Sequence, residues 1–243
     1  MKKINIGLIG TGKTGIKIRE LIENNHNMRQ DFALACSFDI NHRIEDNLDQ
    51  LLLCDIVIVF VPGNANLQFI PILIENKKAA IFGSTGFEWP TRLSEQLIAR
   101  SLTWCWSSNF SLGMLILKRA IKILGEGLSY STSFPKIEIE ETHHIHKKDA
   151  PSGTALRWKE WLIEGAAAGG AAAAELSIPI VSHRQGEVLG RHQLTIESAC
   201  EKIFLSHDAL DRTLFAEGAL FAARKLYQCK TPRGLITFDQ LIN

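Results

Sequence analysis

The sequence lacks an excess of charge of either sign, paired cysteines and long apolar runs. Its 243 residues carry 27 Lys and Arg against 26 Asp and Glu, so there is no basic surplus that would indicate a nucleic-acid partner. No apolar run approaches the roughly 18–20 residues that cross a bilayer. With 46% hydrophobic residues, the composition is far from that of a disordered chain. We expect a folded protein with no nucleic-acid or membrane partner.

The cysteines and the start of the chain exclude further classes. The five cysteines are an odd number and include no Cys-x-x-Cys pair, as a disulfide scaffold or a zinc ribbon would need. We expect them to be buried thiols in a reducing compartment. Residues 1–9 briefly resemble a signal peptide, but a glycine-rich turn interrupts them and no small-residue cleavage site follows. These features predict a cytoplasmic location.

The first hundred residues alternate between strand and helix patterns. Strands are expected at 4–9, 32–38, 55–61 and 79–82, and helices at 16–23, 67–76 and 92–100. The 55–61 stretch is apolar on both faces, which is typical of a parallel sheet with helices on either side. The alternation predicts an α/β fold with a Rossmann-type, doubly wound parallel sheet.

The pattern changes from about residue 109. Helices are expected at 112–124, 154–164 and 209–227, and strands at 136–142, 178–182 and 193–197. We expect a dinucleotide-binding domain over 1–108, a central α+β domain over 109–208, and a return of 209–243 to the first domain. A Gly/Ala tract at 165–174 is expected to be a mobile surface loop, and we assign it no function.

A glycine-rich turn follows the first expected strand. Its residues are Gly10, Thr11, Gly12, Lys13, Thr14 and Gly15, which match G-x-G-x-x-G at the start of a helix. In this pattern the glycines allow a tight turn, the approach of a pyrophosphate and close packing of helix on strand. The backbone N–H groups and the helix dipole then face the anion. The context predicts a dinucleotide site and not a plain turn.

Asp39, at the end of the second expected strand, is the candidate ligand of the adenosine ribose. A carboxylate there accepts a hydrogen bond from the 2′-hydroxyl and repels a 2′-phosphate, which favours NAD. Lys13 and Arg43 lie close enough in sequence to receive a 2′-phosphate. Because only ~1–3 kcal/mol can decide between the two cofactors, the sequence leaves NADH and NADPH open.

The segment 141–156 concentrates chemical groups. Three imidazoles and two ammonium groups fall within His143–Lys148. A metal site is one interpretation, but an extended strand would place His144 and His146 on one face and His143 on the other. The neighbouring lysines would also repel a cation, so we expect no metal. A solvated basic patch is a second alternative.

An anion-binding active site is the interpretation that we favour. Ser152 is a candidate N-cap, which leaves the amides of Gly153 and Thr154 free to bind a carboxylate. A lysine and a histidine just upstream could hold a second carboxylate and supply a proton, since lysine stays protonated and histidine titrates near neutrality. These groups indicate a small dicarboxylate substrate that is reduced by a hydride.

The motif from His143 to Ala155 resembles the signature of the 4-hydroxy-tetrahydrodipicolinate reductase family, formerly called dihydrodipicolinate reductase. Four more motifs resemble the family in register: Gly83-Ser84-Thr85-Gly86-Phe87, Ser108–Gly113, His183–Gly190, and Arg212 with Phe215–Ala219. Three departures are Lys13-Thr14 in place of Arg-Met, Ser84 in place of threonine, and Ser107-Ser108 where Ala-Pro or Ala-Ala is common.

The resemblance implies a dinucleotide domain built from both chain ends and a central domain whose sheet assembles a homotetramer. It implies reduction of 4-hydroxy-tetrahydrodipicolinate to tetrahydrodipicolinate by NADH or NADPH, in diaminopimelate and lysine biosynthesis. His143 is then the acid/base and Lys147 the proton donor, and the substrate carboxylates are bound by His144, Ser152, Gly153 and Thr154. Besides the glycine-rich turn and Asp39, the implied cofactor-binding residues are Gly83, Ser84, Thr85, Ser107, Ser108, Asn109 and Phe110.

Two alternatives remain at this point. One is another NAD(P)-dependent reductase of a small dicarboxylate on the same architecture. The other is a nucleotide-sensing protein that has lost catalysis. The intact His143 and Lys147 argue against a sensor, because a sensor needs no proton donor.

Overall fold

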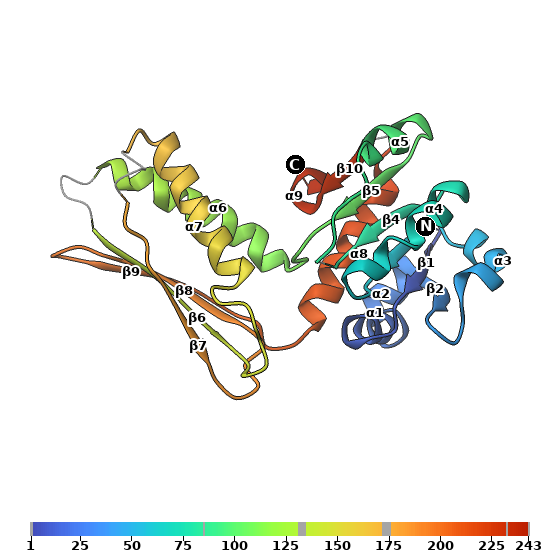
Figure 1. Cartoon of the computed structure of the whole chain (residues 1–243), viewed down its shortest axis with the longest axis horizontal. Helices are drawn as coiled ribbons and strands as arrows, with labels where there is room; N and C mark the ends of the chain where they lie inside the picture. Colours follow the sequence, from blue (N-terminus) through green and yellow to red (C-terminus); the bar gives the residue numbers. More distant parts are fainter. Residues whose placement is uncertain (1, 85, 131–134, 172–175, 232, 243) are drawn as a thin grey trace. The chain divides into compact units, whose positions relative to one another are not determined.

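The chain divides into two compact units, which are drawn in Figure 1. The computed structural model describes residues 2–84, 86–130, 135–171, 176–231 and 233–242. The terminal unit comprises Met1–Leu112 and Arg212–Asn243, and the central unit comprises Gly113–Asp211. None of the helices in the described part of the chain is long and apolar enough to cross a membrane.

The terminal unit contains a six-stranded parallel sheet with the order β10-β5-β4-β3-β1-β2. The strands are β1 (Ile4–Ile9), β2 (Phe32–Phe38), β3 (Ile56–Val59), β4 (Ala79–Phe82), β5 (Thr103–Trp106) and β10 (Gly234–Thr237). The helices are α1 (Lys13–Asn24), α2 (His26–Asp31), α3 (Leu48–Leu52), α4 (Phe69–Glu75), α5 (Leu93–Ala99), α8 (Thr213–Gln228) and α9 (Phe238–Ile242). The predicted doubly wound sheet, formed by both ends of the chain, is confirmed.

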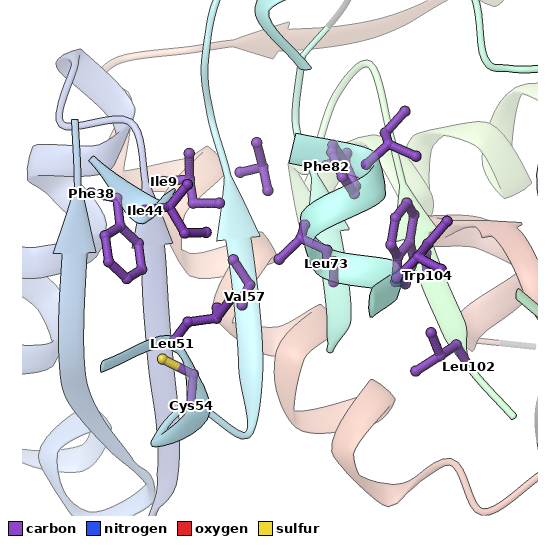
Figure 2. Close-up of a cluster of buried hydrophobic side chains, with 14 of the residues drawn as sticks. Ile9, Phe38, Ile44, Leu51, Cys54, Val57, Leu73, Phe82, Leu102 and Trp104 are labelled. Atoms are coloured by element: carbon purple, nitrogen blue, oxygen red, sulfur yellow. The ribbon is translucent and has the colours of Figure 1, made fainter. Parts of the chain in front are cut away.

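Helices cover both faces of this sheet. On one face, Leu51 of α3, Leu73 of α4 and Leu97 of α5 share a buried cluster with strand residues such as Val57 and Phe82, part of which is shown in Figure 2. Helix α8 contacts β3, β4 and β5 as well as α1. All four residues of β3 are buried because both of its faces are covered.

The central unit contains a four-stranded sheet with the order β7-β6-β8-β9. Its elements are α6 (Leu112–Gly127, whose first residue belongs to the terminal unit), β6 (Lys136–His143), α7 (Gly153–Ala168), β7 (Ile180–Arg184), β8 (Arg191–Glu197) and β9 (Lys202–Asp208). Strand β6 pairs in parallel with β7 and antiparallel with β8. Trp158 and Leu162 of α7 pack with Met114 and Ile121 of α6 in a core that includes Ile139 of β6.

The expectation of a surface loop at the Gly/Ala tract is wrong for its first residues. Gly165 to Ala168 continue α7, and Gly165 is buried. A Cβ atom at Gly165 would lie 2.1 Å from the carbonyl oxygen of Lys122 on α6. The small residues therefore let the two helix backbones approach closely, as α6 and α7 do in Figure 1. Residues 172–174 of the tract lie outside the described residues.

Candidate active site

A cavity of about 630 Å³ lies at the carboxyl ends of the central strands of the terminal unit. Its lining includes Gly10 and Gly12 after β1, Asp39 after β2 and Phe60 after β3. Strand β1 has β2 on one side and β3 on the other, so the chain reverses its direction of winding at this point. The loops diverge there and leave a crevice, which is where open parallel sheets bind ligands.

The glycine-rich turn has the geometry of a phosphate-binding loop. Gly10 has a φ of +97°, and its N–H donates to the carbonyl oxygen of Phe38 at 2.9 Å. A Cβ atom at Gly15 would lie 2.0 Å from the carbonyl oxygen of Gly10, so only glycine lets α1 pack on the turn. A Cβ atom at Gly12 would meet no atom of the residues that the structure describes within 4 Å. Gly12 also precedes α1 without a side-chain cap, which leaves first-turn amides for a pyrophosphate.

Asp39 is held as a carboxylate at the rim of this cavity. One of its oxygens accepts hydrogen bonds from the N–H groups of Asn41 and His42 at 2.9 and 3.0 Å, and the other accepts from the hydroxyl of Thr11 at 3.1 Å. These bonds lower the pKa of Asp39 below its usual value. Arg43 lines the same cavity and pairs with Glu45 at 3.5 Å.

A second, smaller cavity of about 360 Å³ shares residues Gly12 and Phe60 with the first. Its lining also includes Lys13, Thr14, Gly83 and Ser84, so it extends from the glycine-rich turn to the end of β4. Both cavities belong to the terminal unit. Together they connect the ribose candidate Asp39 with the first two residues of the expected nicotinamide side.

The other residues expected near the nicotinamide differ in their exposure and in their hydrogen bonds. Thr85 lies outside the described residues. Ser107 follows β5, and its hydroxyl donates to the carbonyl oxygen of Asn109 at 2.7 Å, which shapes the loop with the exposed Ser108. Phe110 is only 1% exposed. Its ring packs against Phe238, so its side chain belongs to the core and only its backbone is a candidate for binding.

In the central unit, β6 ends at His143, and residues 144–151 form a loop before α7. The argument from the sequence against a metal site assumed an extended strand through His144 and His146. The strand in fact ends before these two residues. Arg184 of β7 anchors this loop, because its guanidinium donates to the carbonyl oxygens of Lys147 and Asp149. The loop is thus fixed from the neighbouring strand.

The expected acid/base and proton donor both lie at this loop. His143 is 6% exposed, and burial lowers the pKa of its imidazole. Lys147 Nζ pairs with a carboxylate oxygen of Asp149 at 2.8 Å, and this contact lowers the pKa of Asp149. Because its pKa is lowered, the imidazole of His143 is neutral near neutral pH. Nδ1 of His144 is buried and has no hydrogen-bond partner among the described residues.

The start of α7 is capped as the sequence predicts. The hydroxyl of Ser152 accepts a hydrogen bond from the N–H of Ala155 at 3.2 Å, and Ser152 itself is 2% exposed. Gly153 is exposed and Thr154 is half-buried. The first turn of the helix contains no acidic residue. The side chain of Ser152 is thus used within the protein, and the neighbouring amides are the better candidates for binding an anion.

Four residues that we did not assign complete the central site: Glu141, Arg184, His192 and Asp149. Glu141 is 1% exposed, and its carboxylate accepts hydrogen bonds from Ser152 and Ser182. Burial raises the pKa of Glu141, but these bonds outweigh burial and the net pKa is lowered. Burial lowers the pKa of His192 to about 4. The i, i+2 spacing of residues 141 and 143 on one strand was the only sequence signal for Glu141.

Glu141, His143 and His192 bring one potential metal-ligand atom each to within 4.8 Å of one another. Both oxygens of Glu141 already accept hydrogen bonds from Ser152, and Nη1 of Arg184 lies 3.7 Å from one of them. Hydrogen-bond donors and the positive charge of Arg184 thus already surround the Glu141 carboxylate. The expectation that the protein uses no metal stays a prediction.

Known proteins resemble the whole chain. The family model described as dihydrodipicolinate reductase, C-terminus, matches residues 112–242. The 4-hydroxy-tetrahydrodipicolinate reductase of Pelagibacter ubique is 30% identical over 100% of this chain and 99% of its own length. This chain belongs to the dihydrodipicolinate reductase family. The Bdellovibrio bacteriovorus family member is 32% identical, over 95% of this chain and 93% of its own.

A solved structure of the family shares the fold. The dipicolinate-bound dihydrodipicolinate reductase from Paenisporosarcina sp. TG-14 superposes with a TM-score of 0.73 at 20% identity. The match covers 98% of this chain and 99% of the other. The family resemblance expected from the sequence motifs is therefore confirmed.

Proposed function

We propose that this chain is an oxidoreductase that reduces 4-hydroxy-tetrahydrodipicolinate to tetrahydrodipicolinate with NADH or NADPH. Family membership supports the reaction class, and one observation carries the assignment of the site. A buried imidazole, a paired lysine and the open N-terminus of α7 are joined by one short loop in the central unit. This arrangement suits a doubly negative ring that needs a proton during reduction.

The N-terminus of α7 binds one substrate carboxylate in this proposal. The Ser152 side chain accepts from the amide of Ala155 and leaves the amides of Gly153 and Thr154 to bind an anion. The helix dipole adds partial positive charge there. His144 is proposed to bind a carboxylate as well, which is supported by its buried Nδ1 atom without a partner in the described chain. Ser152 contributes by capping the helix that presents these amides.

Lys147 is proposed as the proton donor, and His143 as the acid/base. The ion pair with Asp149 holds the ammonium group of Lys147 at the loop. The imidazole of His143 is neutral in the free site because burial lowers its pKa. Two carboxylates bound nearby would favour its charged form, so substrate binding is expected to raise the pKa of His143. The proton would then be available only when the substrate is present.

A nicotinamide cofactor fits the cavities of the terminal unit and, when bound, supplies the hydride. The open space at Gly12 and the uncapped first turn of α1 suit a pyrophosphate, and the ionised Asp39 suits a ribose hydroxyl. We propose that Gly10 to Gly15 bind the pyrophosphate and that Gly83 and Ser84 face the nicotinamide. Ser107 to Phe110, with Thr85, are proposed to complete that side.

The central unit is also proposed to assemble a homotetramer through its sheet. Helices α6 and α7 cover one face of this sheet. On the edge strand β9, large apolar side chains such as Ile203 and Phe204 are 39% and 59% exposed. Exposed apolar side chains on a sheet are typical of an interface between subunits. The cytoplasmic location expected from the sequence remains a prediction.

The activity is tested by supplying the synthase product of pyruvate and aspartate semialdehyde, with NADH or NADPH in excess. We expect loss of nicotinamide absorbance that depends on both the enzyme and the dicarboxylate. A protein that binds NADH, as a rise in its fluorescence would report, but never consumes it would be a nucleotide sensor. Consumption only with a different dicarboxylate would identify another reductase.

A further inference from the structure

Glu141 is a buried carboxylate for which the proposed reaction has no direct use. It lies on β6, two residues before His143, and is 1% exposed. Its two oxygens accept hydrogen bonds from the N–H of Ser152 at 3.0 and 3.1 Å, and one of them also accepts from the hydroxyl of Ser182 at 2.8 Å. A buried charge is costly unless it is hydrogen-bonded, so these donors fix the carboxylate in one place.

The same carboxylate reaches two imidazole rings. One of its oxygens lies 3.7 Å from Nδ1 of His143 and 3.6 Å from Nε2 of His192. Nε2 of His192 lies in turn 3.2 Å from the hydroxyl oxygen of Ser152. Glu141 therefore stands between the proposed acid/base and the residue that begins α7.

Strand pairing explains how these residues meet. Glu141 and His192 are directly opposite each other in the antiparallel pairing of β6 with β8. Glu141 and Ser182 are opposite each other in the parallel pairing of β6 with β7. Two neighbouring strands thus bring Ser182 and His192 to the Glu141 carboxylate of β6, which in turn accepts from the N–H of Ser152, the N-cap of α7.

We propose that Glu141 is a positioning residue that holds the His143 imidazole and the N-terminus of α7 in a fixed relation, so that both act on one substrate. This inference rests on the proposed function. Glu141 acts through its neighbours, because its oxygens are occupied and its side chain is buried. Hydrogen bonds from Ser152 to a charged acceptor are stronger than neutral ones, which suits a fixed geometry.

The test is Glu141→Gln in the full chain. The Gln side chain keeps one acceptor oxygen but turns the other position into an N–H₂ donor, which cannot accept from the Ser152 amide. We expect the affinity for pyridine-2,6-dicarboxylate, measured by calorimetry, to fall ~10–100-fold, the size expected for loss of a charged hydrogen bond. The affinity for NADH should stay within about twofold, because the cofactor site is in the other unit.

Kinetics separate positioning from simple loss of folded protein. We expect KM for the substrate to rise and kcat to fall in Glu141→Gln. A variant that was only less stable would show a lower kcat at an unchanged KM, because fewer molecules would be active. If the Gln variant does not fold, Ser182→Ala serves as the second test. It removes one hydrogen-bond donor to Glu141 and keeps the charge, so it should change KM and kcat in the same direction by a smaller amount.

The matched control is Glu160→Gln, which makes the same chemical change on α7 itself. Glu160 is an exposed residue that pairs with Arg157, so dicarboxylate affinity should be unchanged. Hydrogen exchange adds a readout that does not depend on activity. The amides of residues 152–156 should exchange faster in Glu141→Gln than in the wild type or in the Glu160 control.

Three results would overturn the proposal. The first is wild-type KM, kcat and dicarboxylate affinity in Glu141→Gln. The second is unchanged exchange of residues 152–156, which would refute positioning even if the wild type proved inactive on this substrate. The third is loss of activity on chelation with recovery on adding zinc, which would make the cluster a metal site. An inactive wild type whose Gln variant still shows faster exchange would refute the proposed function alone.

Discussion

At the scale of single residues, Lys147 carries the clearest functional prediction. The structure pairs its ammonium group with Asp149, a contact that its position in the sequence did not indicate. Arg184 holds the backbone around this pair through the carbonyl oxygens of both residues. The lysine is therefore fixed in position as well as charged.

Lys147→Ala is expected to lower turnover by ~10²–10⁴-fold, the usual contribution of a proton donor. NADH affinity, measured by fluorescence titration, should change little, because Lys147 belongs to the central unit. The control is Lys148→Ala, which removes an exposed lysine next in the chain. An equal loss of cofactor affinity in Lys147→Ala would contradict this division of roles.

Asp39→Ala is expected to weaken NADH binding more than NADPH binding. The carboxylate is ionised and held at the cavity rim, where it can accept from a ribose hydroxyl and repel a phosphate. Its removal should lower the affinity for NADH ~10-fold. Asp49→Ala, on α3 and outside the cavity lining, is the control. Equal effects on both cofactors would show that Asp39 does not touch the ribose.

At the scale of elements, close contact between α6 and α7 decides the structure of the central unit. The sequence shows Gly165 only as part of a low-complexity tract. In the folded chain this glycine lies against the backbone of Lys122, and Gly125 of α6 lies against the backbone of Leu162 on α7. A helix contact made through backbone atoms leaves no apolar stripe in the sequence, so periodicity could not reveal it.

Gly165→Ala is expected to destabilise the protein by ~1–3 kcal/mol, the usual cost of overpacking. The added methyl would lie 2.1 Å from a backbone oxygen, so one helix must shift. Gly127→Ala is the matched control, because a Cβ at the end of α6 would meet no atom of the described residues within 4 Å. That variant should be neutral or gain ~0.4–1 kcal/mol. Denaturant unfolding of both variants checks the prediction, which fails if Gly165→Ala is as stable as wild type.

At the scale of the whole molecule, buried histidines connect stability to pH. Burial lowers the pKa of His192 to about 4, and it lowers the pKa of His143 and His207 in the same direction. Below about pH 6.5, the unfolded chain binds protons more readily at these residues than the folded chain does, and for His192 this difference persists to about pH 4. The free energy of unfolding therefore falls as the pH drops through this range. Protonation of Glu141, whose folded pKa is lowered, adds to the loss only below about pH 4.5.

For His192 the decline amounts to about 3 kcal/mol across that window, at about 1.4 kcal/mol per pH unit. His192→Asn should make the free energy of unfolding less steep in pH between 6.5 and 4, whatever its stability at neutral pH. His146→Asn, which changes an exposed residue, should leave the slope as it is. Urea unfolding at a series of pH values measures the slope of the free energy of unfolding against pH. A wild-type slope in His192→Asn would mean that the burial of His192 does not control this response.

The sequence alone determined the doubly wound sheet, the glycine-rich turn after β1 and the family. These features depend on local patterns: apolar strands, glycines at fixed spacing, and Ser152 directly before the helix that it caps. Some short elements were missed, among them α2, β9 and β10. Most residues of β9 are exposed, and its pairing with β8 supplies the order that its own pattern lacks.

Only the tertiary structure decided which groups surround the proposed catalytic residues. Glu141 and His192 are 51 positions apart in the chain, as their numbers show, and meet because β6 and β8 pair in one register. The buried state of Phe110 and the helical start of the Gly/Ala tract likewise depend on distant partners. A single sequence records the types of residues along the chain. Register, burial and the pKa values that follow from them arise only when the strands and helices are packed together.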